Sequence, residues 1–102
     1  MKSDTERWAK ATRRHLEVMG KTGGQLAEMA RLPGSFVSGL ISGQLQNPLS
    51  RHQKEDLFKA VAAGGRYYRR GRDFGDLSHL SDDELLGIYE LTPQPEELGR
   101  NY

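Results

Sequence analysis

The chain has 102 residues and a formal net charge of +1; 35% of its residues are apolar and 28% are charged, which fits one domain with a small core. It contains no cysteine, which excludes disulfide bridges and thiolate metal sites and is typical of a reducing compartment. No apolar run approaches the ~20 residues of a membrane helix, and the N-terminal residues lack the apolar segment of a secretory signal. We therefore expect a cytoplasmic protein that has no membrane-spanning segment.

A repeated pattern marks the starts of the expected helices: a Ser or Thr is followed three residues later by Glu or Gln. In such a capping box the hydroxyl accepts a hydrogen bond from a free backbone N–H of the first turn, and the Glu or Gln side chain bonds back to the capping residue. The matches, each ahead of an apolar-periodic stretch, are Ser3 with Glu6, Thr22 with Gln25, Ser50 with Gln53, and Ser81 with Glu84.

Apolar residues at helical spacing predict five helices. Glycines mark three of the expected ends: Gly20 after the first helix, Gly43 after the third, and the pair Gly64-Gly65 after the fourth. In chain order, with their inward residues, the helices are 4–19 (Trp8, Thr12, Leu16, Met19), 23–31 (Leu26, Ala27, Ala30), 34–42 (Val37, Leu40, Ile41), 50–63 (Leu57, Phe58, Val61) and 82–91 (Leu85, Leu86, Ile88, Tyr89).

The small net charge hides a split along the chain. Residues 1–72 carry 14 Lys and Arg against 6 Asp and Glu, whereas residues 73–102 carry 1 Arg against 8 Asp and Glu. The two balances, +8 and −7, add up to the overall +1. A basic body followed by an acidic tail suggests a polyanionic partner for the body, and a solvated surface with a solubilising tail explains the same split equally well.

Residues 22–48 place two short helices on either side of a tight turn. Short helices are marginal alone, so each has to bury its apolar stripe against its neighbours. Ala27 is the small residue expected where the two helices cross, and the second helix is anchored by Val37, Leu40 and Ile41. The outer face of the second helix carries small or polar residues.

This stretch resembles the lambda-repressor and Cro-like (Xre-type) family of helix-turn-helix proteins. The resemblance is carried by the N-cap Thr22, Leu26-Ala27, Val37-Ser38, Leu40, the closing Gly43, and Pro48 in the loop. It implies an all-α, four- to five-helix lambda-repressor-like helix-turn-helix domain over residues 1–64. A C-terminal extension, residues 65–102, would then hold a basic arm and an acidic helix that is either core or a dimer contact.

The function that the resemblance implies is a sequence-specific DNA-binding transcriptional regulator. Its partner would be double-stranded DNA, and it would act as a repressor that occludes a promoter. A homodimer is expected, because a two-fold protein matches a palindromic site.

Three features depart from the family pattern. The family usually has glycine in the turn, where this chain has Arg31, and it often has Gln after the N-cap, where this chain has Gly23. The expected recognition helix, 34–42, holds no Arg, Lys, Asn or Gln, which are the side chains that make bidentate contacts to base edges. Recognition would then rest on small side chains and on DNA shape.

The resemblance assigns two sets of site residues. The base-facing set is Gly34, Ser35, Phe36, Ser38 and Gly39. The phosphate set, at the start of the first helix of the pair and around the second, is Lys21, Thr22, Gly23, Gln25, Arg31, Ser42, Gln44, Asn47 and Arg51. Phosphate contacts position a protein on DNA, and a helix N-terminus supplies free N–H groups for them. Taken singly, each of these polar residues is better explained as ordinary surface, and phosphate contact is favoured only for the set as a whole.

The segment 66–76 has no clean period and reads as a loop, an extended arm or a short strand. Its first seven residues hold two tyrosines and four arginines: Arg66, Arg69, Arg70 and Arg72. Two interpretations fit equally. The segment is either a basic arm that follows phosphates or enters a minor groove, or a surface strand whose tyrosines complete the core.

The sequence offers no motif for catalysis. His15, His52 and His79 fall in separate elements without a ligand pair such as H-x-x-x-H, and there is no phosphate loop of Walker type. We therefore expect neither an enzyme nor a metal or other cofactor.

Two alternatives keep the fold but change its use. The uncharged second helix and an exposed Phe36 favour a protein-interaction module, although the basic surplus of residues 1–72 argues against it. The other alternative is an antitoxin whose acidic tail binds a toxin protein.

Overall fold

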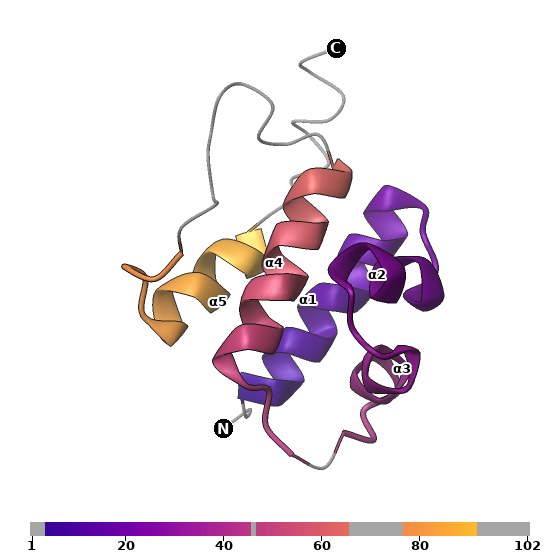
Figure 1. The fold of residues 1–102 in the computed structure, drawn as a ribbon, viewed down its shortest axis with the longest axis horizontal. Helices are drawn as coiled ribbons and strands as arrows, with labels where there is room; N and C mark the ends of the chain where they lie inside the picture. Colours follow the sequence, from indigo (N-terminus) through magenta and orange to yellow (C-terminus); the bar gives the residue numbers. More distant parts are fainter. Residues whose placement is uncertain (1–3, 46, 66–76, 92–102) are drawn as a thin grey trace.

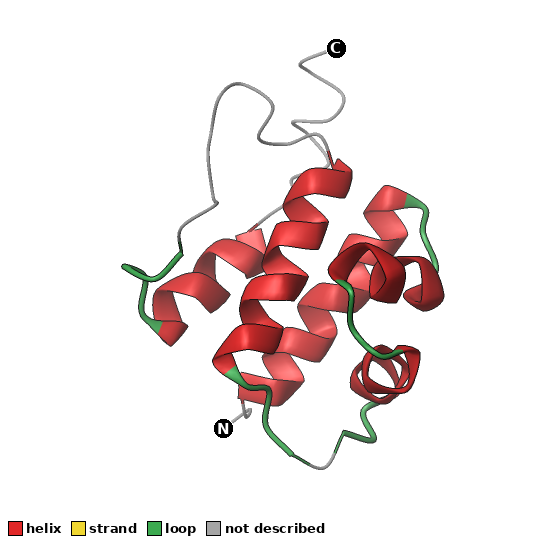
Figure 2. Cartoon of the chain, viewed as in Figure 1, coloured by secondary structure: helices red, strands yellow, loops and turns green. Residues whose placement is uncertain are grey.

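In the computed structural model the chain is described over residues 4–45, 47–65 and 77–91. These residues form five α-helices, namely α1 (Asp4–Met19), α2 (Gly23–Ala30), α3 (Gly34–Ser42), α4 (Arg51–Gly65) and α5 (Asp82–Leu91). The three described ranges contain no strand, which confirms the expected all-α class for this part of the chain (Figures 1 and 2). None of the described helices is long and apolar enough to cross a membrane.

Capping boxes form at three of the four predicted helix starts. At α2 the Thr22 hydroxyl accepts from the Gln25 N–H at 3.2 Å, and Gln25 Oε1 accepts from the Thr22 N–H at 2.9 Å. The same reciprocal pair opens α4 and α5, between Ser50 and Gln53 and between Ser81 and Glu84. Ser3, which belongs to the fourth predicted box, lies outside the described residues. Local hydrogen bonding therefore sets the starts of these helices, as expected.

The end of α4 differs from the prediction. Gly64-Gly65 was expected to stop the helix, yet both glycines are helical and α4 reaches Gly65. Glycine in a helix is only about 1 kcal/mol less favourable than alanine. It ends a helix when its own backbone turns left-handed, as Gly20 and Gly43 do here with φ of 68° and 79°.

All five helices contribute to one core. Its largest fully buried side chains are Trp8 of α1, Phe58 of α4 and Tyr89 of α5. α1 contacts α3, α4 and α5, and α2 contacts α3 and α4. The predicted inward residues are buried or, for four of them, half-buried against this core: Leu16, Met19, Ile41 and Ile88. Periodicity missed seven further buried residues: Ala9, Ala11, His15, Leu49, Lys54, Ala60 and Leu77.

A buried polar cluster joins α5 to α1. The Thr12 hydroxyl donates to the Trp8 carbonyl at 2.7 Å, so its oxygen accepts from the Tyr89 hydroxyl, also at 2.7 Å. His15 Nε2 donates to the Tyr89 carbonyl at 2.7 Å. The Tyr89 ring lies against both Trp8 and His15, with centroid distances of 4.4 Å and 4.5 Å. We call these four residues the α1–α5 cluster.

Ion pairs hold both ends of α5. Glu90 receives a two-pronged pair from Arg7, at 2.6 Å and 3.0 Å, and its carbonyl accepts from Arg14. Near the other end, Asp82 lies 2.8 Å from Arg51 and 3.3 Å from Lys54, and these cations lower the pKa of its carboxyl group. The helix expected in a C-terminal extension is thus docked on α1 and α4, and a dimer contact through it stays a prediction.

Arg31 is the only non-glycine residue of the described chain with a positive φ, at 58°. A Cβ atom destabilises this left-handed conformation by roughly 1–2 kcal/mol. We therefore expect Arg31→Gly to raise the free energy of unfolding by about 0.5–1 kcal/mol, since part of the relief is offset by the extra freedom of glycine in the unfolded chain. Urea denaturation measures the change. Arg31→Ala is the control, because it removes the charge but keeps the Cβ, and an equal gain from it would contradict backbone strain as the cause.

Candidate nucleic-acid interface

The α2–α3 pair is joined by three residues, Arg31, Leu32 and Pro33. The left-handed Arg31 donates its N–H to the Glu28 carbonyl at 3.2 Å, and Leu32 donates to the Ala27 carbonyl at 3.0 Å. These bonds satisfy the last carbonyls of α2. Pro33 comes next and accepts the first backbone bonds of α3. α2 therefore ends and α3 begins within one turn, with Arg31 in the place where glycine was expected.

Gly23 brings the start of α2 close to α3. A Cβ at this position would lie 2.8 Å from Cδ1 of Ile41 and 3.8 Å from Cγ1 of Val37. Even the first carbon of a side chain would therefore push Ile41 aside. This contact favours glycine after the N-cap, where the helix-turn-helix pattern often has Gln.

α3 has two distinct faces. Val37 and Leu40 are buried in the core, and Ile41 is half-buried beside them. Opposite them, Ser35, Ser38 and Ser42 are exposed and follow one another at spacings of three and four residues. We call these three residues the serine stripe. Gly34 is exposed as well, and a Cβ built on it would meet no atom within 4 Å.

Two of the five expected base-facing residues are less accessible than the rest. Phe36 is half-buried and packs against the core, so it is not the freely exposed side chain that the sequence suggested. Gly39 is also half-buried, and a Cβ there would touch Cδ1 of Leu45 at 3.7 Å. The helix has a period of 3.6 residues, so Phe36 turns away from the serine stripe, whereas Gly39 borders the stripe beside Ser35 and Ser42 and is covered by Leu45.

Most of the expected phosphate set lies on the surface. Lys21 and Gly23 are half-buried, whereas the exposed members are Thr22, Gln25, Arg31, Ser42, Gln44 and Asn47. The four arm arginines, Arg66, Arg69, Arg70 and Arg72, lie outside the described residues.

Arg51 has another role. Its guanidinium bonds Glu55 at 2.7 Å, Asp82 at 2.8 Å and the Leu77 carbonyl at 2.7 Å. These three acceptors take up its Nε and both Nη atoms. The side chain thus ties α4 to α5, and we leave it out of the candidate interface. Sequence spacing could not reveal this, because two of the acceptors lie 26 and 31 residues away.

No family model matches the chain. A search of the curated proteins and a search of the solved structures also find no match. Any assignment of function therefore depends on the chemistry of the α2–α3 surface.

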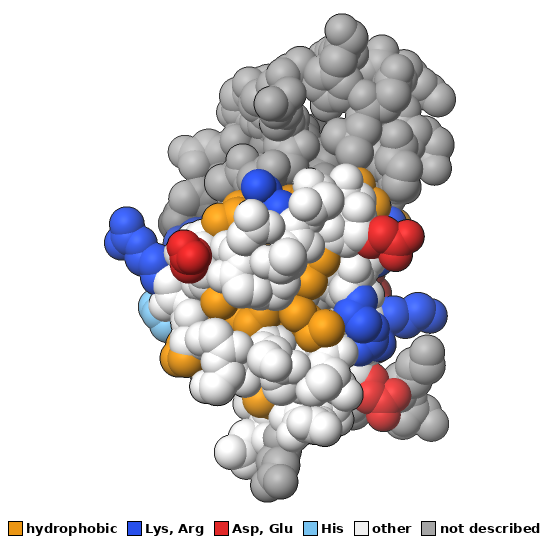
Figure 3. Space-filling model, turned by 90° about the vertical axis from the view of Figure 1, so that its right-hand side faces the viewer, with side chains coloured by type: hydrophobic (Ala, Val, Ile, Leu, Met, Phe, Trp, Pro, Cys, Tyr) orange, Lys and Arg blue, Asp and Glu red, His pale blue; other side chains and the backbone are white. Residues whose placement is uncertain are grey.

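The side of the molecule that carries α2 and α3 has an uncharged middle and charged margins of both signs. In Figure 3, apolar and uncharged groups fill the centre of this face, and Lys and Arg side chains stand at its margins together with Asp and Glu side chains. The uncharged centre is the part of this face that could meet base edges, which are themselves uncharged. Any contact with phosphate would have to come from particular cations at the margins.

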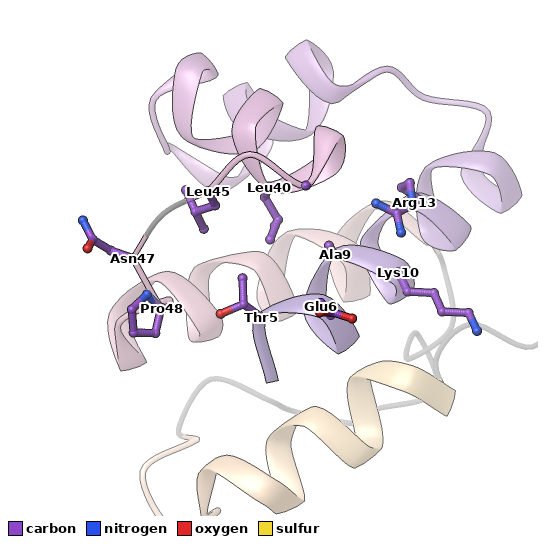
Figure 4. Close-up of a pocket in the computed structure, with 10 residues that line it drawn as sticks. Thr5, Glu6, Ala9, Lys10, Arg13, Leu40, Leu45, Asn47 and Pro48 are labelled. Atoms are coloured by element: carbon purple, nitrogen blue, oxygen red, sulfur yellow. The ribbon is translucent and has the colours of Figure 1, made fainter. Parts of the chain in front are cut away.

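A hollow beside α3 brings in two cations that the sequence analysis did not select. It has a volume of about 520 Å³ and lies between residues 5–13 of α1 and the end of α3 with its following loop. Figure 4 shows Lys10 and Arg13 of α1 near one end of it and Asn47 of the loop near the other. Leu40 and Leu45 line it from the side of α3. The i, i+3 spacing of Lys10 and Arg13 predicts that they share one face of α1. The spacing does not predict which other helix this face contacts.

The histidines do not form a site. His15 is fully buried in the α1–α5 cluster, while His52 is exposed and lies 3.1 Å from Asp56. Among the described residues, no three side chains of the metal-binding types gather around one point.

Proposed function

We propose that the protein is a sequence-specific DNA-binding regulator that uses the α2–α3 pair as a helix-turn-helix of the lambda-repressor type. In this proposal α3 enters the major groove, which is about 12 Å wide and admits a helix. The protein would act as a homodimer and repress transcription by covering a promoter. The observation that carries the proposal is the serine stripe: α3 is fixed to the core on one face and leaves the other face free of packing.

The start of α2 supports phosphate binding next to this stripe. The capping box uses the Gln25 N–H, while the N–H groups of Gly23 and Gly24 belong to the first turn and have no intrahelical partner. The helix dipole adds partial positive charge at this end. Glycines leave these N–H groups uncovered by side chains, so a phosphate oxygen can approach them closely.

The chemistry of α3 indicates how bases would be read. A serine hydroxyl both donates and accepts, so it bonds to several base edges with little discrimination. We therefore expect modest direct readout from Ser35 and Ser38, with a larger share of the specificity coming from DNA shape and deformability.

Ser35→Glu tests this placement. A carboxylate on the groove-facing side of α3 would meet the negative field of the duplex, so affinity is expected to fall about 10- to 100-fold, or roughly 1.4–2.7 kcal/mol. Fluorescence anisotropy with a mixed duplex at about 50 mM salt measures the change, since non-specific binding is strong there. Ser35→Gln is the control, because glutamine has nearly the same size as glutamate but carries no charge. Its affinity for the duplex is expected to stay within a few-fold of that of the parent. If Ser35→Glu binds as well as the parent, α3 is not at the groove.

A protein-interaction module is the second candidate, and the apolar centre of the face in Figure 3 favours it. Salt separates the two functions. Binding through several phosphates weakens by orders of magnitude between about 50 and 200 mM salt. Absence of DNA binding at the lower concentration would favour a protein partner for the same face.

A further inference from the structure

We infer that α1 adds a basic edge to the DNA interface, in which Arg13 and Lys10 bind backbone phosphate beside the C-terminal end of α3. The inference rests on the proposed function and extends it to a helix outside the α2–α3 pair. The interface would then contact phosphate at two places, beside the C-terminal end of α3 and at the start of α2.

Arg13 is held in place rather than free to sample the solvent. Its Nη1 donates to the Ile41 carbonyl at 2.7 Å, although the residue as a whole is exposed. A guanidinium carries five N–H donors, and this bond uses one of them. The remaining donors stay at the surface next to the last turn of α3, fixed at little further entropic cost on binding.

The position of Arg13 also removes an electrostatic obstacle. The C-terminal end of a helix carries about half a negative charge, which repels phosphate. α3 has no basic residue in its last turn. The Gly43 and Gln44 N–H groups bond the carbonyls of Leu40 and Gly39, and the Ile41 carbonyl receives the charged Arg13. The Arg13 guanidinium therefore offsets the negative dipole charge at the C-terminal end of α3, which is the end that phosphate would approach.

The hollow in Figure 4 links this edge to the loop. Asn47, which belongs to the phosphate set, lines the same hollow as Lys10 and Arg13. A backbone strand that contacts Asn47 would therefore lie at the same hollow as the two cations. Glu6 lines the hollow as well, so Glu6, Lys10 and Arg13 together carry a net charge of +1.

The dependence of affinity on salt tests the edge directly, because each phosphate contact contributes about 0.9 to the slope of log K against log salt. Arg13→Ala and Lys10→Ala are each expected to lower the magnitude of the slope by about one. The loss of affinity between about 50 and 200 mM salt then shrinks about fourfold for each variant. Lys59→Ala, at an exposed lysine of α4 outside the proposed interface, is the matched control and should keep the parent slope.

Arg13→Lys distinguishes a phosphate contact from a purely structural bond to Ile41. The lysine keeps the charge, so the slope should be close to that of the parent even if affinity changes. If Arg13 had only a structural role, Arg13→Ala would lower the melting temperature and the affinity but leave the slope unchanged. Parent-like slopes in both alanine variants would overturn the α1 edge while leaving the helix-turn-helix proposal standing. A parent protein that binds no duplex at the lower salt concentration would overturn both.

Discussion

Tyr89→Ala is expected to remove about 3–5 kcal/mol from the free energy of unfolding, which is the usual range for deleting a large buried aromatic side chain. Tyr89 is fully buried, and its ring contacts Trp8, His15 and Phe58. Small domains are stable by only 5–15 kcal/mol, so the variant would be close to unfolding at room temperature. Urea denaturation at pH 7, followed by circular dichroism, measures the loss.

Tyr89→Phe is the matched control, because it keeps the ring and removes only the hydroxyl. Thr12 still has the Trp8 carbonyl as its acceptor, so the cost should be about 1 kcal/mol, the value of one hydrogen bond. If the two variants lose the same stability, the ring contacts are not what holds α5. A loss below about 1 kcal/mol in Tyr89→Ala would show that the α1–α5 cluster contributes little.

Acidification is expected to remove about 3 kcal/mol through His15 alone. Burial lowers the pKa of His15 from 6.5 to about 4; the bond to the Tyr89 carbonyl opposes this shift, and the charge of Arg14 adds to it. Between about pH 6.5 and pH 4, His15 is therefore protonated in the unfolded state and neutral in the folded state. The free energy of unfolding falls as the pH drops through this range. About 2 kcal/mol of this loss should appear between pH 7 and pH 5, above the range in which carboxylates titrate.

His15→Gln removes the titration while keeping a donor for the Tyr89 carbonyl. Its stability should change much less between pH 7 and pH 5 than that of the parent, whatever its absolute stability. Urea denaturation at the two pH values gives the difference. Parallel pH profiles for the two proteins would mean that another group causes the acid sensitivity.

The parts of the fold that could be predicted from the sequence depend on neighbours within a few residues. The Thr22–Gln25 box and the turn at Gly43 are complete within four or five residues, and both form as expected. The buried faces of α2 and α3 follow from a helical period for the same reason. The expected function and the dimer remain predictions.

The features that the sequence missed depend on residues far apart in the chain. His15 lies on a polar-looking stretch of α1, and its burial depends on Tyr89, 74 residues later. The sequence placed Arg51 and Phe36 on the interface, but Arg51 is bonded to Glu55, Asp82 and the Leu77 carbonyl, and Phe36 packs against the core under α3. Arg13 was overlooked because its partner, the Ile41 carbonyl, is a backbone atom that no side-chain pattern reveals.

The α1–α5 cluster also bears on the order of events during synthesis. α1 emerges first from the ribosome, but Thr12 and His15 meet Tyr89 only after a further 77 and 74 residues have been added. Contacts between such distant residues require a long loop to close, which slows folding compared with helix pairs that are adjacent in the chain. Trp8 and its neighbours therefore stay uncovered on one side until almost all of the described chain has been made. In the nascent chain the Trp8 side chain would be available to chaperones that bind exposed apolar groups.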